Sequence, residues 1–337
     1  MSKLLSIIIP TYNMEKYVGQ CLASMTSPEV PDTLEVIAVN DGSKDGSLAI
    51  LNSFREKRPD IVKVIDKPNG NYGSCINAAL PQCTGKYVRI VDADDWVETK
   101  NLVKLIGTLE DCNADVIISN YTKYYQTSER MIIYSPQLFV EGSLDIEDVR
   151  LREFNASRDF VMHSMTFSKT LLDKCHLSHT EGISYTDFEY VYYPLMDART
   201  ILMLDVNIYN YRIGREGQTI NIDQERKHAL DWQKIANRIV DNYTISNGKN
   251  LRRFQIDLAA RAISSYYWSI IVIKARDEHD YYELRLFDKK LKNSDIDLYN
   301  KLNEVRCIGV KYIDKWRKTN NPPFPWWIYA FLKRLRP

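Results

Sequence analysis

The sequence lacks the features that mark membrane, secreted and disulfide-stabilised proteins. No uninterrupted apolar run approaches the ~18 residues that a membrane span needs. No signal peptide is recognisable, because the first apolar run, residues 4–9, is short and continues into a turn. The six cysteines are scattered without a C-x-x-C pair, which favours reduced, packed thiols. We therefore expect a cytoplasmic protein that at most lies on the inner face of the cell membrane.

Strong net charge and two glycine-rich fingerprints are also missing. The net charge is only +1, so we expect no nucleic-acid partner. Residues 69–73 (NGNYG) precede a predicted helix, and their glycines permit close approach of the backbone to a ligand. They match neither the P-loop nor the G-x-G-x-x-G dinucleotide pattern. Neither ATP hydrolysis nor NAD chemistry is indicated.

The carboxyl end of the chain carries an uneven share of the positive charge. Residues 311–337 hold seven basic residues and one acid, so this tail is +6 and the rest of the chain is −5. Such a basic tail suits an anionic membrane surface. Packing onto the catalytic domain is an equally reasonable interpretation, and self-association through the helical region is a third. The aromatic residues interleaved with the charges are Trp316, Trp326, Trp327, Tyr329 and Phe331.

Strand and helix patterns alternate in the first third of the chain. Strands are predicted at residues 4–9, 34–39, 61–65, 86–91 and 115–119, with helices at 15–25, 48–54, 74–80 and 102–109. This alternation predicts an α/β fold whose mostly parallel central sheet has helices on both faces.

The later part of the chain predicts a second region. Residues 121–183 are less regular and rich in aromatic residues, and 200–211 form a last strand. Thr186 and Glu189 form a capping-box pattern at a helix start. Beyond residue 222 only helical patterns occur. We therefore predict a catalytic domain at 1–221 and a C-terminal helical region with the basic aromatic tail at 222–337.

Polar clusters follow three of the predicted strands, at residues 11–13, 40–43 and 92–95. Ligands of such sheets bind at the carboxyl ends of the strands. A scaffold needs turn residues there, but it does not need carboxylates after both the second and the fourth strand. The three clusters together therefore predict a ligand site at this edge.

The third cluster contains Asp92, Asp94 and Asp95. Adjacent carboxylates repel one another unless a cation or hydrogen-bond donors offset them. Their hard oxygens suit Mg²⁺ or Mn²⁺, which complete their coordination with substrate phosphates. An acidic turn that caps the next helix is an equally good interpretation of this spacing alone.

The other polar residues have a functional and a structural interpretation each. Asp41 could accept the imide N–H of uracil or serve as a turn residue, and Tyr12 could stack on a nucleobase or simply end its strand. Asp187, at the first position of its helix, is either a general base or a cap acid. Arg212 and Arg215 lie in a loop that either closes over a diphosphate or is solvated.

These motifs together resemble those of the family 2 inverting glycosyltransferases. The resemblance rests on residues 7–13 (IIIPTYN), 39–47 (VNDGSKDGS), 69–70 (NG), 85–88 (GKYV) and 92–95 (DADD), in this order. It implies a Rossmann-like GT-A fold, a nucleotide-sugar donor and a D-x-D motif that binds Mn²⁺ or Mg²⁺. His163 does not belong to these motifs, and we expect it to be structural.

The resemblance also implies roles for individual residues. Asp94 matches the metal ligand and Asp187 the catalytic base, although Thr186 stands where many relatives have glutamate. Tyr12 and Asp41 match the nucleobase contacts, and Asp92 matches the first acid of the D-x-D motif, near the ribose or the sugar. Apart from the resemblance, we also assign Pro10 and Asn69 to the nucleotide sugar, and Arg212 and Arg215 of the glycine-bearing loop to its diphosphate.

The implied function is metal-dependent transfer of a sugar, with UDP-hexose or UDP-N-acetylhexosamine favoured through Asp41. The acceptor would be a hydroxyl of a saccharide or of a lipid-linked oligosaccharide in polysaccharide synthesis of the bacterial cell envelope. A sugar-nucleotide nucleotidyltransferase is one alternative, but it needs a glycine-rich basic loop where residues 10–13 stand. A catalytically inactive binding or assembly module is the other.

Overall fold

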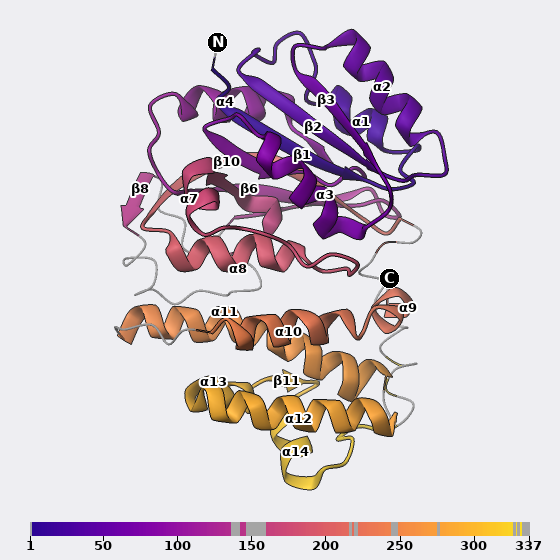
Figure 1. Ribbon diagram of the computed structural model, residues 1–337, viewed down its shortest axis with the longest axis vertical. Helices are drawn as coiled ribbons and strands as arrows, with labels where there is room; N and C mark the ends of the chain where they lie inside the picture. The colour runs from indigo at the N-terminus through magenta and orange to yellow at the C-terminus, as the bar shows by residue number, and fades with distance from the viewer. Residues whose placement is uncertain are drawn as a thin grey trace. The chain divides into compact units, whose positions relative to one another are not determined.

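A computed structural model describes residues 2–135, 142–145, 160–215, 218, 222–243, 249–274, 277–325, 328 and 331. The chain divides into two compact units, Met1–Arg215 and Glu216–Pro337. The first unit contains the large sheet and the second is mainly helical (Figure 1). The functional division into residues 1–221 and 222–337 stays a prediction.

A mixed sheet forms the centre of the first unit. Its order is β3-β2-β1-β4-β9-β6-β10-β5, with β7 on β6 and β8 on β10. The parallel pairs are β1/β2, β2/β3, β1/β4 and β6/β10. The strands are β1 (Leu5–Thr11), β2 (Leu34–Asp41), β3 (Val62–Lys67), β4 (Tyr87–Ile90), β5 (Trp96–Val97), β6 (Val116–Tyr125), β7 (Arg130–Tyr134), β8 (Gly142–Asp145), β9 (Met165–Ser168) and β10 (Thr200–Ile213).

Helices cover both faces of this sheet (Figure 1). One face carries α1 (Val18–Ala23), α2 (Ser47–Lys57) and α4 (Thr99–Leu109), and the other carries α3 (Asn71–Ala79), α7 (Lys169–Lys174) and α8 (Asp187–Asp197). Every residue of β1 and β2 is buried, which explains their nearly continuous apolar runs. The predicted α/β fold, with a mostly parallel sheet covered on both faces, is confirmed.

Two local features differ from the predictions. The antiparallel β9 lies between β4 and β6, and no strand was predicted there because its four residues carry no periodic signal. The helix predicted at Thr186 does begin at Asp187, but the capping box is wrong because the Thr186 side chain makes no cap hydrogen bond. The Glu189 carboxylate instead accepts from the backbone and hydroxyl of Thr180, each over 2.7 Å.

In its described residues, the second unit is a set of helices with one short strand pair. Its elements are α9 (Ile222–Lys227), α10 (Asp231–Asp241), α11 (Lys249–Trp268) with a π-helical continuation (Ser269–Lys274), α12 (Glu278–Ser294), α13 (Ile296–Leu302), β11 (Arg306–Cys307), β12 (Val310–Lys311) and α14 (Tyr312–Thr319). The expectation of helices only is wrong at β11–β12. A tight turn joins the two strands through Ile308 and Gly309, both at positive φ.

The first part of the basic aromatic tail packs inside the second unit. Trp316 on α14 is only 1% exposed, and its ring lies 5.9 Å from that of Tyr267. Arg317 is paired with Asp288 over 2.7 Å. These contacts favour internal packing for residues 312–319. The remaining tail residues named above, apart from Phe331, lie outside the described residues, as do Lys333, Arg334 and Arg336.

One helix in the described part of the chain, Leu251–Lys274, is long and apolar enough to cross a membrane by length and composition. Two thirds of its apolar window (67%) is buried within the structure. A core helix of a globular unit has the same properties, so this helix is weak evidence for a membrane span.

Candidate active site

The polar clusters predicted at three strand ends lie at the same edge of the sheet. β1 pairs with β2 so that Thr11 is opposite Asn40, and with β4 so that Ile8 is opposite Ile90. Because these strands are parallel, the residues that follow them leave the sheet on the same side. The sheet topology therefore brings Tyr12, Asp41 and the Asp92–Asp95 turn to one edge.

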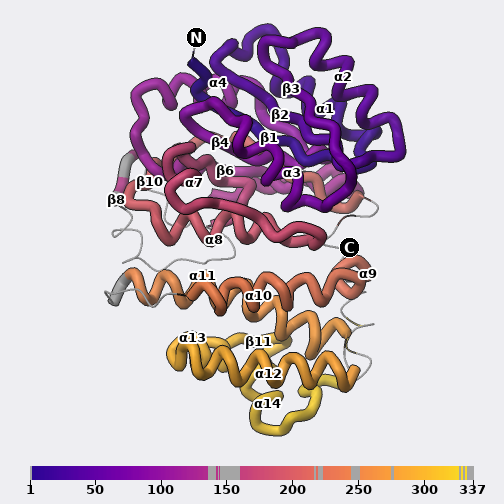
Figure 2. The backbone as a smooth tube through the Cα atoms, viewed as in Figure 1, coloured from indigo at the N-terminus to yellow at the C-terminus, as the bar shows by residue number. Residues whose placement is uncertain are grey.

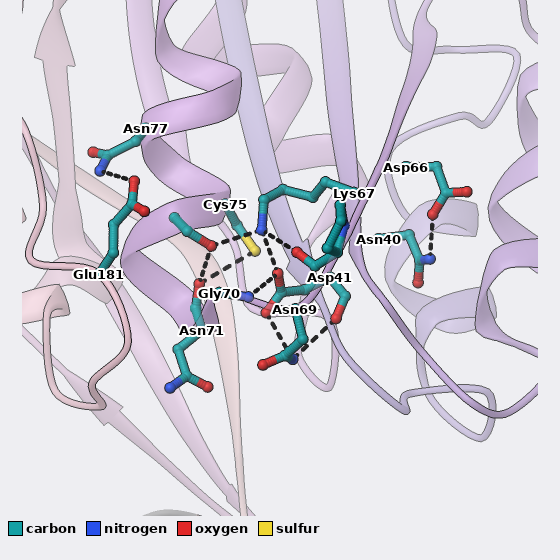
Figure 3. A network of polar contacts seen from close by, with 12 residues as sticks. Asn40, Asp41, Asp66, Lys67, Asn69, Gly70, Asn71, Cys75, Asn77 and Glu181 are labelled. Carbon is teal, nitrogen blue, oxygen red and sulfur yellow. Dashed lines mark hydrogen bonds and ion pairs between the residues drawn. The ribbon is translucent and has the colours of Figure 1, made fainter.

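Asp41, the last residue of β2, is held by a compact polar network (Figure 3). Its Oδ1 accepts from Lys67 Nζ over 2.6 Å and from the Gly70 backbone over 2.9 Å. Its Oδ2 accepts from Asn69 Nδ2 over 3.0 Å. Asp41 is only 2% exposed, and the ammonium group of Lys67 offsets its charge in this buried position.

The other predicted nucleotide residues differ in accessibility. Pro10 is buried within β1 opposite Val39, so it shapes the strand end from inside. Tyr12 is 45% exposed, and its ring is available to a ligand at this edge. Gly42 follows Asp41 at φ +70°, and a Cβ there would lie 3.0 Å from the Asn69 backbone nitrogen. Glycine at this position therefore allows the Asp41 turn to approach Asn69.

The Asp92–Asp95 turn follows β4 and is buttressed from two elements. Asp92 Oδ1 accepts from the Tyr72 hydroxyl over 2.7 Å. Asp95 is 1% exposed and accepts from the Tyr209 hydroxyl over 2.6 Å and from the Arg212 backbone over 2.7 Å. Both Asp95 oxygens therefore serve the structure of the turn.

Burial and mutual repulsion change the acidity of this turn. Burial and the charge of Asp94 raise the pKa of Asp92 to about 7, and the hydrogen bond from Tyr72 only partly opposes this shift. Burial, followed by Asp94 and Asp92, raises the pKa of Asp95 well above its ordinary value. A cation in contact with the turn would favour the ionised forms of these carboxylates.

The two predicted arginines both contact Asp94. Arg215 Nε forms an ion pair with the Asp94 carboxylate, and Arg212 Nε donates to the Asp94 carbonyl over 2.8 Å. The Arg212 guanidinium is also stacked 4.8 Å from the Trp96 ring centroid and 5.1 Å from that of Tyr17. Arg212 is thus embedded in the wall of the site, whereas Arg215 touches the carboxylate predicted to bind the metal.

His163 lies beside the acidic turn. A ligand atom from each of Asp92, Asp95 and His163 lies within 4.8 Å of the others, which is close enough for one metal ion. The imidazole stacks on Tyr211 with ring centroids 4.3 Å apart and meets Tyr209 edge-on. The ring is therefore held in place by packing, as expected for a structural histidine, but it also adds a nitrogen donor to the site.

Asp187 is the first residue of α8 and interacts electrostatically with the acidic turn. Its charge contributes to the raised pKa of Asp92, after burial, Asp94 and the opposing Tyr72 hydrogen bond. It also adds to the effects of burial and Asp92 that raise the pKa of Tyr72. The structure therefore brings Asp187 into the electrostatic neighbourhood of the acidic turn, although about ninety residues separate them in the sequence.

Sequence reasoning missed the residues that support the acidic turn. Tyr72 lies within the NGNYG segment, in which the sequence predicted a role only for the glycines and for Asn69. Tyr209 lies inside β10, where a tyrosine is an ordinary strand residue. Neither has a local sequence signal for its role, because each hydroxyl gains its carboxylate partner only through the tertiary fold.

The sequence and the fold are both similar to those of known proteins. Residues 6–174, half of the chain, match the family model described as glycosyl transferase family 2. Glycosyltransferase GlyG of Streptococcus pneumoniae serotype 4 (strain ATCC BAA-334 / TIGR4) is 26% identical over 73% of this chain and 82% of its own length. The chondroitin synthase of Pasteurella multocida (strain Pm70) is 40% identical over 74% of this chain, but the match spans only 25% of that protein.

The fold as a whole resembles a solved structure. The crystal structure of Staphylococcus aureus TarS residues 1–349 in complex with UDP-GlcNAc superposes with a TM-score of 0.65. The likeness covers 94% of this chain and 92% of that one at 20% identity. At this level of identity the likeness establishes the fold, which is GT-A with a C-terminal helical region.

Proposed function

The chain belongs to glycosyl transferase family 2, and we propose that it is a metal-dependent inverting enzyme that uses a nucleotide-sugar donor. Membership makes it a glycosyltransferase of the bacterial polysaccharide type. The observation that most supports the detailed proposal is that Asp41 and the Asp92–Asp95 turn lie at one edge of the sheet, and that the charge of Asp187 at the start of α8 acts on Asp92. A donor could span this edge from base to sugar.

The nucleotide would lie at the Asp41 end of the site. Asp41 receives the base, Tyr12 stacks on it, and Pro10 and Asn69 shape the surrounding wall. We propose UDP as the nucleotide because a carboxylate suits the imide N–H of uracil, and because TarS, which shares the fold, binds UDP-GlcNAc. The sugar is then a hexose or an N-acetylhexosamine, which Asp92 contacts at the ribose or at the sugar itself.

The acidic turn has the chemistry of a site for Mn²⁺ or Mg²⁺. Its carboxylate oxygens are the hard ligands that these ions prefer. Burial and the charge of Asp94 raise the pKa of Asp92, and a bound cation would oppose this shift. We assign Asp94 as the main protein ligand from the family motif, whereas the ligand atoms that lie within 4.8 Å of one another come from Asp92, Asp95 and His163. When bound, the ion offsets the charge that develops on the leaving diphosphate.

Asp187 would act on the acceptor. Its carboxylate takes the proton of the acceptor hydroxyl as that oxygen attacks the anomeric carbon from the face opposite the diphosphate. The new glycosidic bond forms while the bond to the diphosphate breaks, so the anomeric centre inverts. Arg215 can leave Asp94 and pair with the diphosphate, because guanidinium matches phosphate geometry. Arg212 supports this loop and contributes positive charge.

We propose a saccharide or lipid-linked oligosaccharide of the bacterial cell envelope as the acceptor. Such acceptors are assembled where nucleotide sugars are made, so we place the enzyme in the cytoplasm. Contact with the inner face of the membrane would involve the part of the tail beyond residue 325, since Trp316 is buried. Self-association through the helical region is a further possibility for the assembled enzyme.

A panel of nucleotide sugars tests this function directly. Each is incubated with Mn²⁺, with Mg²⁺ or with a chelator, and release of the nucleotide is measured. We expect metal-dependent release from one UDP-sugar above all others. Asp187→Asn should lower that turnover by about a thousandfold while the affinity for UDP is retained. Release of pyrophosphate from a nucleoside triphosphate and a sugar phosphate would instead favour the nucleotidyltransferase, and no turnover with any donor would favour an inactive binding module.

A further inference from the structure

The segment that precedes Asp187 is fastened to helix α3. We call residues 177–186 the base loop; it runs between α7 and α8, along α3 (Figure 2). Asn77 on α3 pairs with His179 in both directions, donating to its carbonyl over 3.0 Å and accepting from its N–H over 2.8 Å. Asn77 also donates to Glu181 over 2.9 Å (Figure 3). One amide side chain thus holds both backbone groups of His179 and the carboxylate of Glu181.

The contact between α3 and the base loop is close enough to require glycine. A Cβ built on Gly73 would lie 2.3 Å from the Thr180 carbonyl oxygen and 2.9 Å from His179 Cβ. Both distances are well inside van der Waals contact, and the first involves backbone. Any larger residue at Gly73 would therefore push the base loop away from α3.

The base loop also forms hydrogen bonds with the segment beside Asp41 and with α8. At one end, Gly182 N–H donates to the Gly70 carbonyl over 2.9 Å, and Gly70 N–H donates to Asp41. At the other end, the fully buried Glu189 on α8 accepts from the backbone and hydroxyl of Thr180. The base loop therefore connects the Asp41 turn with the first turns of α8.

Helix α3 contacts the acidic turn as well. Tyr72, the residue before Gly73, donates its hydroxyl to Asp92 over 2.7 Å. The same short helix thus carries Tyr72 toward Asp92 and Asn77 toward the base loop. A single rigid element is in a position to set the distance between the donor carboxylates and Asp187.

We propose that Asn77, Gly73 and Thr180 are positioning residues, which hold the base loop on α3 so that Asp187 is aligned with the donor. This inference rests on the proposed role of Asp187 as the base. None of the three residues needs to touch the substrate. Their effect is on alignment, and a displacement of about 1 Å in an active site can cost about a hundredfold in rate.

A pair of helix glycines provides the first test. Gly73→Ala improves helix propensity in α3 but forces the Thr180 carbonyl to move, whereas Gly107→Ala in α4 adds a Cβ that meets nothing within 4 Å. Turnover is measured with the UDP-sugar that the wild type hydrolyses fastest with Mn²⁺, and binding with UDP by calorimetry. We expect kcat to fall about ten- to a hundredfold in Gly73→Ala, with UDP affinity within about twofold of wild type. Gly107→Ala should match the wild type in both.

Thr180 provides a second test with its own rescue. Thr180→Val keeps the shape of the side chain but removes the hydroxyl that donates to Glu189, and Thr180→Ser keeps that hydroxyl. We expect Thr180→Val to lower kcat about tenfold at unchanged UDP affinity and Thr180→Ser to restore most of it. Asn77→Ala should resemble Thr180→Val.

The outcomes separate this inference from the proposed function. If Asp187→Asn abolishes turnover but Gly73→Ala and Thr180→Val keep a wild-type kcat, the positioning role is wrong and the proposed base stands. If UDP affinity and melting temperature fall in parallel with kcat, the contacts serve only to stabilise the fold, which also overturns the inference. If Asp187→Asn keeps full turnover, Asp187 is not the base, and both the proposed function of Asp187 and the positioning role are overturned.

Discussion

Asp41 and the Asp92–Asp95 turn lie at the same edge of the sheet, but their partners come from different parts of the chain. Lys67, Asn69 and Gly70 follow Asp41 by 26, 28 and 29 residues. The partners of Asp94 and Asp95 on β10 and in the loop after it lie 114 to 121 residues further along the chain. The first group is assembled within one β-α-β unit, and the second requires the whole first unit to fold.

The Asp41 site and the acidic turn also differ in how their negative charge is offset. The charge of Asp41 is offset by Lys67 Nζ at 2.6 Å. In the acidic turn three carboxylates repel one another, and burial together with Asp94 raises the pKa of Asp92 to about 7. The charge of Asp41 is thus offset by a lysine of the fold, whereas the acidic turn would gain stability from the cation that we propose for it. This difference is what we expect between a site that binds a neutral base and one that binds a metal diphosphate.

The largest expected effect comes from removing a carboxylate of the acidic turn. Asp94→Asn should lower turnover by at least about a hundredfold and weaken Mn²⁺ binding, because the amide is a poorer ligand for a hard cation. Turnover and an EPR titration of free Mn²⁺ measure the two effects. The exposed Asp111→Asn is the matched control. Unchanged Mn²⁺ affinity in Asp94→Asn would show that Asp94 is not the metal ligand.

Removing the charge of Asp41 should weaken the binding of UDP more than it lowers kcat. Asp41→Asn leaves Lys67 without its countercharge and replaces one of the two acceptor oxygens of Asp41 with an NH2 donor. We expect UDP affinity to fall about ten- to a hundredfold, with kcat at saturating donor changed much less. Calorimetry with UDP and with GDP measures affinity and preference. Equal UDP affinity in the variant and the wild type would contradict the nucleobase role.

A third carboxylate of this sheet sharpens the electrostatic comparison. Glu35 on β2 is fully buried; burial opposes its ionisation, but hydrogen bonds from Lys63, Ser6 and Thr84 outweigh this and hold its pKa below the usual value. The folded state then binds fewer protons than the unfolded state. The stability from Glu35 is complete above the unfolded pKa of about 4.3 and is lost as pH falls through the lower, folded pKa.

Glu35→Gln should therefore cost about 2 kcal/mol of unfolding free energy at pH 7, since the amide loses the charge and keeps only one of the two acceptor oxygens that serve Lys63, Ser6 and Thr84. Urea unfolding at pH 7 and near pH 4 should show a smaller pH dependence in the variant than in the wild type. The exposed Glu56→Gln serves as control and should change neither value appreciably. A variant with the wild-type pH dependence would rule out Glu35 as its source.

The smallest effect should come from the support of the acidic turn. Tyr209→Phe removes the hydroxyl that donates to Asp95 over 2.6 Å and accepts from the Asp92 backbone over 3.2 Å. We expect a loss of about 1 kcal/mol in unfolding free energy, because one buried carboxylate loses a donor. Chemical denaturation measures it, with Tyr12→Phe on the exposed Tyr12 as control. A loss as small as that of the control would mean that Arg212 alone is enough to hold Asp95.

The sequence was most informative where structure is local. The strands β1, β2 and β4 were predicted because each is a short apolar run that ends in turn residues. The strand β9 was missed because its position between β4 and β6 depends on pairing with strands far away in the sequence. The prediction of a capping box was wrong for a similar reason. The Glu189 carboxylate accepts hydrogen bonds from Thr180 of the preceding loop.

The sequence alone determined the α/β class, the family resemblance and the residues at the three strand ends, because apolar periodicity and turn chemistry are written in consecutive residues. Only the tertiary structure decided that Tyr209 and Arg215 contact the acidic turn, that the charge of Asp187 acts on it, and that α3 holds the base loop. These are contacts between distant segments. Their geometry depends on how the whole sheet is paired and how closely Gly73 allows two backbones to approach.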